Sequence, residues 1–136
     1  MKMTNRVFRA YTKECEGLVP IKLYGSLITK KDKAFISFFN PENSLTIREV
    51  IPETVSLNTG ICDESGMQIF EGDEVLISVP VQNKATVSTK ANVVWRRGGF
   101  HYLLEKTQTL NSLDSLHPDV KILVIGNIHE RYGENH

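Results

Sequence analysis

Apolar and polar residues alternate along most of this chain, and that two-residue period limits what it can fold into. Residues 6–11 read Arg-Val-Phe-Arg-Ala-Tyr, residues 21–24 read Ile-Lys-Leu-Tyr, and residues 45–51 read Leu-Thr-Ile-Arg-Glu-Val-Ile. Such a period is typical of strands that bury one face, whereas an amphipathic helix repeats every 3.6 residues. Pro52 ends the third segment, because proline cannot donate to a strand ladder. The pattern predicts a mainly β protein.

Short polar segments separate the apolar ones and predict turns. Residues 30–33 (Lys-Lys-Asp-Lys) and 96–99 (Arg-Arg-Gly-Gly) each lie between two strand-like segments, as in a hairpin. Residues 63–66 (Asp-Glu-Ser-Gly) predict a turn in which the aspartate bonds nearby backbone and the glycine takes a positive φ. Residues 71–73 (Glu-Gly-Asp) predict a second tight turn, with Asp73 accepting bonds from unpaired N–H groups.

Two local features interrupt the strand pattern. Gly126 and Asn127 lie inside the last apolar segment and predict a β-bulge, where Asn127 would tolerate the left-handed conformation. Leu110, Leu113 and Leu116 recur every three residues within residues 107–118. That spacing fits one or two helical turns, and it fits equally well an irregular loop with buried leucines. We therefore expect at most one short helix.

Many short strands joined by frequent turns indicate a β-barrel or a pair of packed sheets. Residues 40–44 have the composition of a turn or linker. We place N-terminal strands and a hairpin in residues 1–44 and a β-barrel core in residues 45–136. One continuous domain is the alternative, since 136 residues suit a single domain.

Charge is balanced overall, with 16 basic and 16 acidic side chains and a formal net charge of +0. This argues against a protein that coats nucleic acid or a membrane through bulk electrostatics. The balance is a cancellation between segments, because residues 1–50 carry +4, residues 51–80 carry −6 without one lysine or arginine, and residues 81–136 carry +2. The longest aliphatic run, residues 122–125, is far too short to span a bilayer. Cys15 and Cys62 stand alone, which favours reduced thiols and a cytoplasmic protein, with a single disulfide between them as the alternative.

In the acidic segment, Thr59-Gly60, Asp63, Gly66, Ile69-Phe70 and Glu71-Gly72-Asp73 follow one another along the chain. This motif resembles the signature of the YopX family, small proteins encoded by phages and prophages of bacteria. Three other segments agree in the same order: residues 8–11 (Phe-Arg-Ala-Tyr), residues 93–100 with their Val-Val-Trp and Gly-Gly-Phe, and residues 124–130 (Val-Ile-Gly-Asn-Ile-His-Glu), where His129 replaces a usual aromatic. The residues of the structural signature are Thr59, Gly60, Asp63, Gly66, Phe70, Glu71, Gly72, Asp73, Gly126 and Asn127. The resemblance implies an all-β protein with an SH3-like barrel core, and it implies no established biochemical activity.

The chemistry-bearing residues favour structural roles over catalysis. Glu71 and Asp73 could act as an acid–base pair or as metal ligands, but the turn interpretation accounts for both. The four histidines show no metal-ligand spacing, and neither cysteine has a recognisable activating base. Nucleophile elbows and phosphate-binding glycine loops are absent from the sequence. We therefore predict no enzyme, no metal and no cofactor.

Two basic turns are candidate binding sites for nucleic acid or a partner. One holds Lys30, Lys31 and Lys33, and the other holds Arg96 and Arg97 beside Trp95. Basic loops with aromatic residues on a β-barrel can bind single-stranded nucleic acid. The simpler interpretation is that the charges solubilise two turns while the aromatic residues pack the core.

We therefore predict a non-enzymatic phage or prophage protein in the cytoplasm of a bacterial host, a β-barrel that binds another protein or itself as a homo-oligomer. The segregated charges favour contact between unlike surfaces. The alternative is a nucleic-acid-binding accessory protein that uses the basic hairpin loops. No membrane partner is expected.

Overall fold

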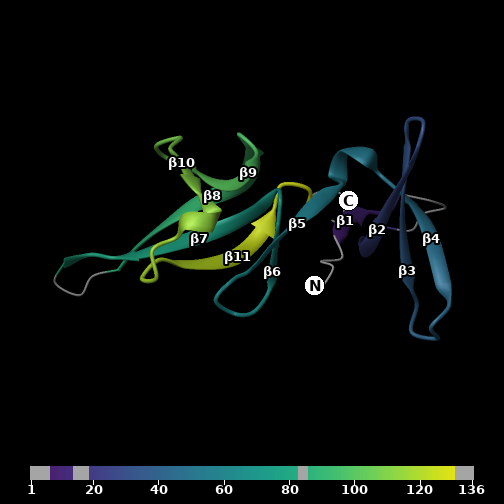
Figure 1. The fold of residues 1–136 in the computed structure, drawn as a ribbon, viewed down its shortest axis with the longest axis horizontal. Coiled ribbons are helices and arrows are strands. Elements are labelled where there is room, and N and C mark those ends of the chain that lie inside the picture. The colour runs from purple at the N-terminus through teal and green to yellow at the C-terminus, as the bar shows by residue number, and fades with distance from the viewer. Residues whose placement is uncertain (1–6, 14–18, 83–85, 131–136) are drawn as a thin grey trace. The chain divides into compact units, whose positions relative to one another are not determined.

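The computed structural model describes residues 7–13, 19–82 and 86–130 of the chain, and these form antiparallel strands joined by turns (Figure 1). None of the described residues lies in an α-helix, so the prediction of a mainly β protein is confirmed. Contacts divide the chain into two compact units. Unit 1 comprises residues 1–58 and 129–136, and unit 2 comprises residues 59–128.

Unit 1 is a sheet in which neighbouring strands are antiparallel. Its strands are β1 (Phe8–Tyr11), β2 (Lys22–Lys30), β3 (Lys33–Phe39), β4 (Leu45–Val50) and the first residues of β5 (Ser56–Cys62), in the order β4-β3-β2-β1-β5. The 3-10 turn η1 (Pro52–Thr54) separates β4 from β5. Alternate residues of the strands meet in a core of Ala10, Leu23, Ala34, Ile36 and Val50.

The β2–β3 hairpin confirms the turn predicted at residues 30–33. Lys30 pairs with Lys33, and Lys31 adopts a φ of 57° between them. Glycine weakens the interior of a strand, but β2 passes through Gly25 unbroken. A Cβ atom at that position would overlap the backbone oxygen of Ser37. Glycine therefore allows two chains to approach closely here rather than ending the strand.

Residues 40–44 form the loop of the β3–β4 hairpin. Asn40 Oδ1 accepts hydrogen bonds from the backbone N–H groups of Glu42 at 3.0 Å and Ser44 at 2.9 Å. Because β4 pairs with β3 along its whole length, it belongs with the N-terminal strands. The contacts divide the chain after Asn58, so the boundary expected after residue 44 lies inside unit 1.

Unit 2 is built on a five-stranded antiparallel sheet with the order β10-β9-β8-β7-β11. These strands are β7 (Asp73–Pro80), β8 (Thr86–Arg96), β9 (Gly99–Leu104), β10 (Leu110–Ser112) and β11 (Lys121–Asn127). The remaining residues of β5 and β6 (Gln68–Phe70) precede them. The buried core consists of Ile69, Val75, Ile77, Ala91, Val93, Tyr102, Leu113 and Ile122.

The closed barrel expected from the family resemblance is not formed among the described residues. In unit 2, β10 and β11 are the two edges of an open sheet. The free edge of β11 is bonded instead by the turn after β5, because Glu64 N–H donates to the Ile122 carbonyl at 2.9 Å. In unit 1, a single bridge joins Thr12 to Val50, which is too short to make a strand ladder. An edge covered by a loop has no need to close on another strand.

The segment with three regularly spaced leucines forms no α-helix. Leu110 lies in β10 opposite Leu103, and Leu113 begins the one-turn 3-10 helix η3 (Leu113–Ser115). Leu113 is almost fully buried, so the alternative of an irregular segment with a buried leucine is the closer of the two predictions. Among the described residues, no helix is long and apolar enough to cross a membrane.

Candidate functional site

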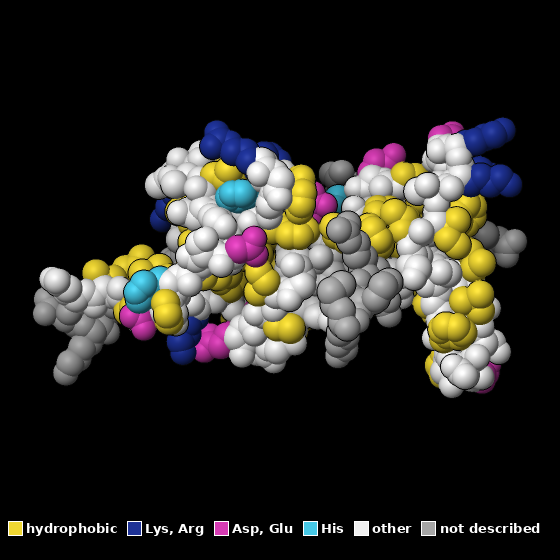
Figure 2. All heavy atoms as spheres, viewed as in Figure 1, with side chains coloured by type: hydrophobic (Ala, Val, Ile, Leu, Met, Phe, Trp, Pro, Cys, Tyr) yellow, Lys and Arg dark blue, Asp and Glu magenta, His cyan; other side chains and the backbone are white. Residues whose placement is uncertain are grey.

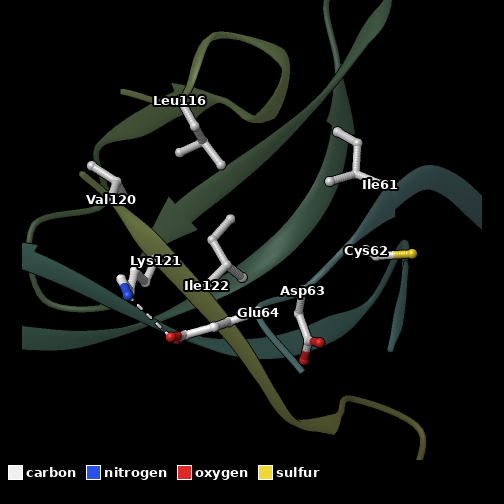
Figure 3. Close-up of a pocket in the computed structure, with 8 residues that line it drawn as sticks. All are labelled: Ile61, Cys62, Asp63, Glu64, Leu116, Val120, Lys121 and Ile122. Carbon is white, nitrogen blue, oxygen red and sulfur yellow. Dashed lines mark hydrogen bonds and ion pairs between the residues drawn. The ribbon is translucent and has the colours of Figure 1, made fainter. Parts of the chain in front are cut away.

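Unit 2 contains a shallow pocket of about 250 Å³, and Asp63 is the one signature residue that lines it (Figure 3). It lies between the end of β5, the turn that follows it, and the segment leading into β11. The residues that line it are Ile61, Cys62, Asp63, Glu64, Leu116, Val120, Lys121 and Ile122. Its volume is below the range of about 300–1,000 Å³ that is common for small-molecule sites. It is large enough for one apolar side chain of a partner.

The pocket has an apolar floor and a charged rim. Ile61, Leu116 and Ile122 point toward its centre, whereas Cys62 points away from it (Figure 3). At the rim, Lys121 Nζ lies 3.2 Å from Glu64 Oε1. Both side chains are more than half exposed, so this ion pair adds little to stability.

Asp63 holds the turn beside the pocket and also the edge of β11. Its Oδ1 accepts hydrogen bonds from Ser65 N–H, Ser65 Oγ–H and Met67 N–H at 2.8–2.9 Å, and its Oδ2 accepts one from Val124 N–H at 2.9 Å. Burial raises the pKa of the Asp63 carboxyl, but these hydrogen bonds outweigh burial and hold its pKa below the ordinary value. The predicted turn is confirmed, with Gly66 at a φ of 91°. The bond to Val124, 61 residues away, has no local signal in the sequence.

The turn at residues 71–73 has the predicted conformation. Gly72 adopts a φ of 88°, and its N–H donates to the Val93 carbonyl at 2.8 Å. Asp73 is only 1% exposed, and its Oδ2 accepts a hydrogen bond from Phe70 N–H at 2.8 Å. Glu71 is half-buried beside it. The Asp73 carboxylate therefore holds the backbone where the chain enters β7.

The other signature residues also organise backbone in unit 2. Thr59 Oγ1 donates to the Ile69 carbonyl at 2.7 Å, and Gly60 adopts a φ of 83°. The bulge predicted in the last strand is confirmed, because the pairing of β11 with β7 shifts between Val124 and Gly126. Asn127 is buried opposite Asp73, and it does not adopt the left-handed conformation that it could tolerate. The bulge is absorbed before Asn127, at Ile125, so Asn127 keeps its place in the ladder.

The two basic turns belong to different units. Lys30, Lys31 and Lys33 are exposed at the end of the β2–β3 hairpin in unit 1. Arg96 and Arg97 are exposed at the β8–β9 turn in unit 2. We therefore consider each turn as a separate candidate site rather than as one basic surface.

The β8–β9 turn carries an exposed aromatic side chain. Trp95 is 46% exposed, and its ring packs edge-on against Phe100, with 4.8 Å between the centroids. Trp95 lies opposite Phe100, on the side of the sheet that carries Val93 and Tyr102. The expectation that Trp95 packs into the core therefore holds only in part, because the strand extends past the end of the core.

The remaining reactive side chains form no described site. Among residues 7–13, 19–82 and 86–130, no group of three or more His, Cys, Asp or Glu side chains could hold a metal ion. His136 and Cys15 lie outside those residues, so the expectation of two reduced thiols stays a prediction. Cys62 is exposed and has no disulfide partner among the described cysteines.

Sequence reasoning missed an exposed apolar surface of unit 1. The outer face, as we call it, is the side of β2, β3 and β4 that points away from the core. Its residues are Lys22, Tyr24, Ser26, Ile28, Lys30, Lys33, Phe35, Ser37, Phe39, Leu45, Ile47 and Glu49. Phe39, Leu45 and Ile47 are 68%, 61% and 53% exposed, and hydrophobic side chains are visible along β3 and β4 in Figure 2. The signal was present in residues 34–39, where the apolar run leaves neither side of the strand polar.

A family model and a solved structure each match nearly the whole chain. A family model described as YopX protein matches residues 7–132. The crystal structure of protein EF1440 from Enterococcus faecalis resembles this chain with a TM-score of 0.52, at 22% sequence identity, over 93% of this chain and 94% of that one. At this level of identity the likeness concerns the fold alone. No curated protein matches.

Proposed function

Because the chain belongs to the YopX protein family, whose model matches residues 7–132, we propose that it is a non-enzymatic binding module that acts by contacting other protein surfaces. The observation that carries this proposal is the outer face of unit 1. Phe39, Leu45 and Ile47 each expose more than half of their surface there. Contiguous exposed apolar side chains of this size commonly mark a protein–protein interface.

The roles of the acidic residues support the same proposal. The Asp63 carboxylate accepts four hydrogen bonds from its surroundings, and Asp73 accepts one from Phe70 N–H. Both side chains are buried. Carboxylates that are buried and accept such hydrogen bonds stabilise turns. Contacts made by the protein surface are therefore the simpler explanation of the function. We take the protein to be of phage or prophage origin and to work in the bacterial cytoplasm.

A comparison of the native chain with an outer-face variant tests the proposal. We would attach an affinity tag to the native chain and to a Phe39→Ser, Ile47→Ser variant, and cross-link each one pure and in bacterial extract. We expect the native chain to form cross-linked species, either with itself or with a specific protein, that the variant loses. Equal cross-linking of both chains, or none by either, would refute the proposal.

Nucleic-acid binding is the second candidate function, and one observation at the turns favours it. Lys31 and Arg97 have φ angles of 57° and 51°, where glycine or asparagine is the usual residue. A strained conformation is a reason to ask about function. At the β8–β9 turn, this conformation presents Arg97 beside Arg96 and the half-exposed Trp95. Stacking of a base on Trp95 with a phosphate near the arginines is the mode of contact we propose for this alternative.

Titration with a fluorescent single-stranded oligonucleotide tests this alternative. We expect binding at low salt that quenches Trp95, the single tryptophan of the chain, and that weakens as salt is added. The Arg96→Ser, Arg97→Ser variant should lose this binding, and Lys30→Ser, Lys33→Ser reports separately on the other turn. If no anisotropy change occurs at low salt with single- or double-stranded oligonucleotides, the alternative is wrong.

A further inference from the structure

The apolar side chains of β4 point outward and its polar ones lie on the core side, which is the reverse of the usual arrangement in an exposed strand. Leu45 and Ile47 point outward, whereas Thr46 and Arg48 are on the core side. A shift of one residue would turn both apolar side chains inward. The fully buried Val50, paired with Ala34, fixes the observed register. The sequence of β4 is therefore typical of a strand whose outward side is covered by another surface.

The outer face is continuous across three strands. Phe39 lies opposite Leu45, Ile47 lies opposite Ser37, and Phe35 lies opposite both Glu49 and Ile28. On β2, Ile28 adds an exposed fraction of 41% beside Phe35, and Tyr24, in the part of the strand that pairs with β1, adds 46%. With about 150–250 Å² on each large side chain when fully exposed, the exposed apolar area of this face is about 500 Å².

This area matches what a dimer with an interface of standard size needs. A stable interface buries about 800 Å² on each partner, and homodimer interfaces are about 65% apolar. The apolar share of such an interface is therefore about 500 Å² per partner. One copy of the outer face supplies that area to another copy without a contribution from unit 2.

The two ends of the outer face carry opposite charge. At the β2–β3 turn, Lys30, Lys31 and Lys33 outnumber Asp32, and Glu42 lies in the β3–β4 loop at the opposite end. Figure 2 shows the basic side chains at one end of this hairpin pair and hydrophobic side chains between the ends. Two such faces can pack with their strands in the same or in opposite directions. Only the opposite direction brings the lysines of one copy to Glu42 of the other.

We propose that the outer face of unit 1 binds a second copy of this chain, sheet on sheet, about a two-fold axis perpendicular to the strands. Phe39, Leu45 and Ile47 form the apolar centre of the contact, and each lysine-bearing turn lies against the Glu42 loop of the other copy. Two sheets packed in this way interdigitate side chains about 10 Å apart. This inference rests on the proposed binding function and names its partner.

Light scattering and sedimentation of the native chain, across its accessible concentrations, test for the dimer. We expect a mass of twice 15.4 kDa for the native chain and of 15.4 kDa for Phe39→Ser, Ile47→Ser. Met67→Ser is the matched control, because Met67 is 56% exposed but lies in unit 2, and this variant should stay dimeric. Circular dichroism and thermal unfolding verify that each variant is folded.

Charge reversal tests the direction of the two strands. We expect Glu42→Lys alone, and Lys30→Glu with Lys33→Glu, each to raise the dimer dissociation constant roughly tenfold, because each creates two like-charge contacts per dimer. The triple variant Lys30→Glu, Lys33→Glu, Glu42→Lys should recover native affinity, since it exchanges the charges of the two ends of the outer face. Recovery supports the two-fold arrangement, and its absence overturns it.

The failure of this inference is distinguishable from that of the proposed function. A native monomer that still cross-links another protein through Phe39 and Ile47 overturns the dimer and leaves the binding function standing. A dimer that survives Phe39→Ser, Ile47→Ser overturns the inference as well, because it must use a different surface. A native monomer that cross-links nothing overturns both.

Discussion

Asp63 shows how one carboxylate can determine the conformation of two distant segments. Its two oxygens serve different partners, since Oδ1 closes the turn through Ser65 and Met67 and Oδ2 reaches the backbone of Val124. A buried edge N–H that lacks an acceptor costs about 1–3 kcal/mol. The side chain therefore closes a loop and protects a sheet edge at the same time.

We predict that Asp63→Asn lowers the free energy of unfolding by about 1–3 kcal/mol at pH 7, because the new amide places an NH₂ group against a backbone donor. The folded pKa of Asp63 is below its unfolded value, so its ionised form stabilises the protein above about pH 4. That contribution is lost as pH falls through the folded pKa. Denaturant unfolding from pH 7 to pH 3 should show the native chain and the variant converging.

The exposed neighbour Glu64 provides the control for this measurement. Glu64→Gln removes only the rim ion pair with Lys121, and we expect a change within about 0.5 kcal/mol at any of these pH values. A constant difference between Asp63→Asn and the native chain down to pH 3 would contradict the role assigned to the ionised carboxylate.

Gly25 is constrained by space rather than by conformation. We predict that Gly25→Ala destabilises the protein by about 3 kcal/mol, since the added methyl group overlaps the Ser37 carbonyl and comes within 3.0 Å of Ile36 Cγ2. Thermal unfolding measures this loss. Gly99→Ala is the matched strand control, because its Cβ would meet only His101 at an ordinary 3.7 Å. Equal unfolding temperatures for the two variants would show that β2 can move away from β3.

At the scale of elements, the predicted turn of the β8–β9 hairpin contains one residue, Arg97, whose type does not favour its conformation. Both central residues have positive φ, with Arg97 at 51° and Gly98 at 76°, as in a type I′ turn. Asparagine tolerates this conformation better than arginine does. An arginine here costs some stability, as expected if the turn was selected for its charge rather than for its conformation.

We predict that Arg97→Asn stabilises the protein by about 0.5–1 kcal/mol through relief of this strain. Thermal unfolding should show a rise for Arg97→Asn and a fall for Arg97→Val, whose branched side chain is the least compatible with positive φ. Titration of the same Arg97→Asn variant with single-stranded oligonucleotide measures the effect on binding separately from the effect on stability. A fall in stability for Arg97→Asn would mean that the guanidinium makes a compensating contact.

At the scale of the whole molecule, the net charge is zero because equal numbers of basic and acidic side chains cancel. The chain has 16 basic and 16 acidic side chains, and its isoelectric point is about 6.9. We predict a solubility minimum near pH 7, since molecules with little net charge repel one another weakly. Static light scattering from pH 5.5 to pH 8.5 measures the attraction between molecules. Lys106→Glu, at an exposed position, should move the minimum to lower pH, and an unmoved minimum would contradict this explanation.

The sequence by itself determined the local structure, because its signals are local. Alternation predicted the strands, Gly66 and Gly72 predicted turns with positive φ, and Gly126 predicted the bulge. The family resemblance held over nearly the whole chain. Each of these depends on residues close together in the chain, where backbone conformation and hydrogen bonding follow from neighbouring residue types.

The tertiary structure alone decided which surfaces each strand buries and how the sheets end. Alternation shows that one side of β4 is apolar, but the register that buries Val50 determines that this side faces outward. The edge of β11 is covered by the turn after β5, through the bonds of Asp63 to Val124 and of Glu64 to Ile122, which no local pattern shows. The tertiary structure alone also decided the outer face, because this surface brings together side chains from three strands. Burial and pairing depend on residues distant in sequence, and only the folded chain brings those residues together.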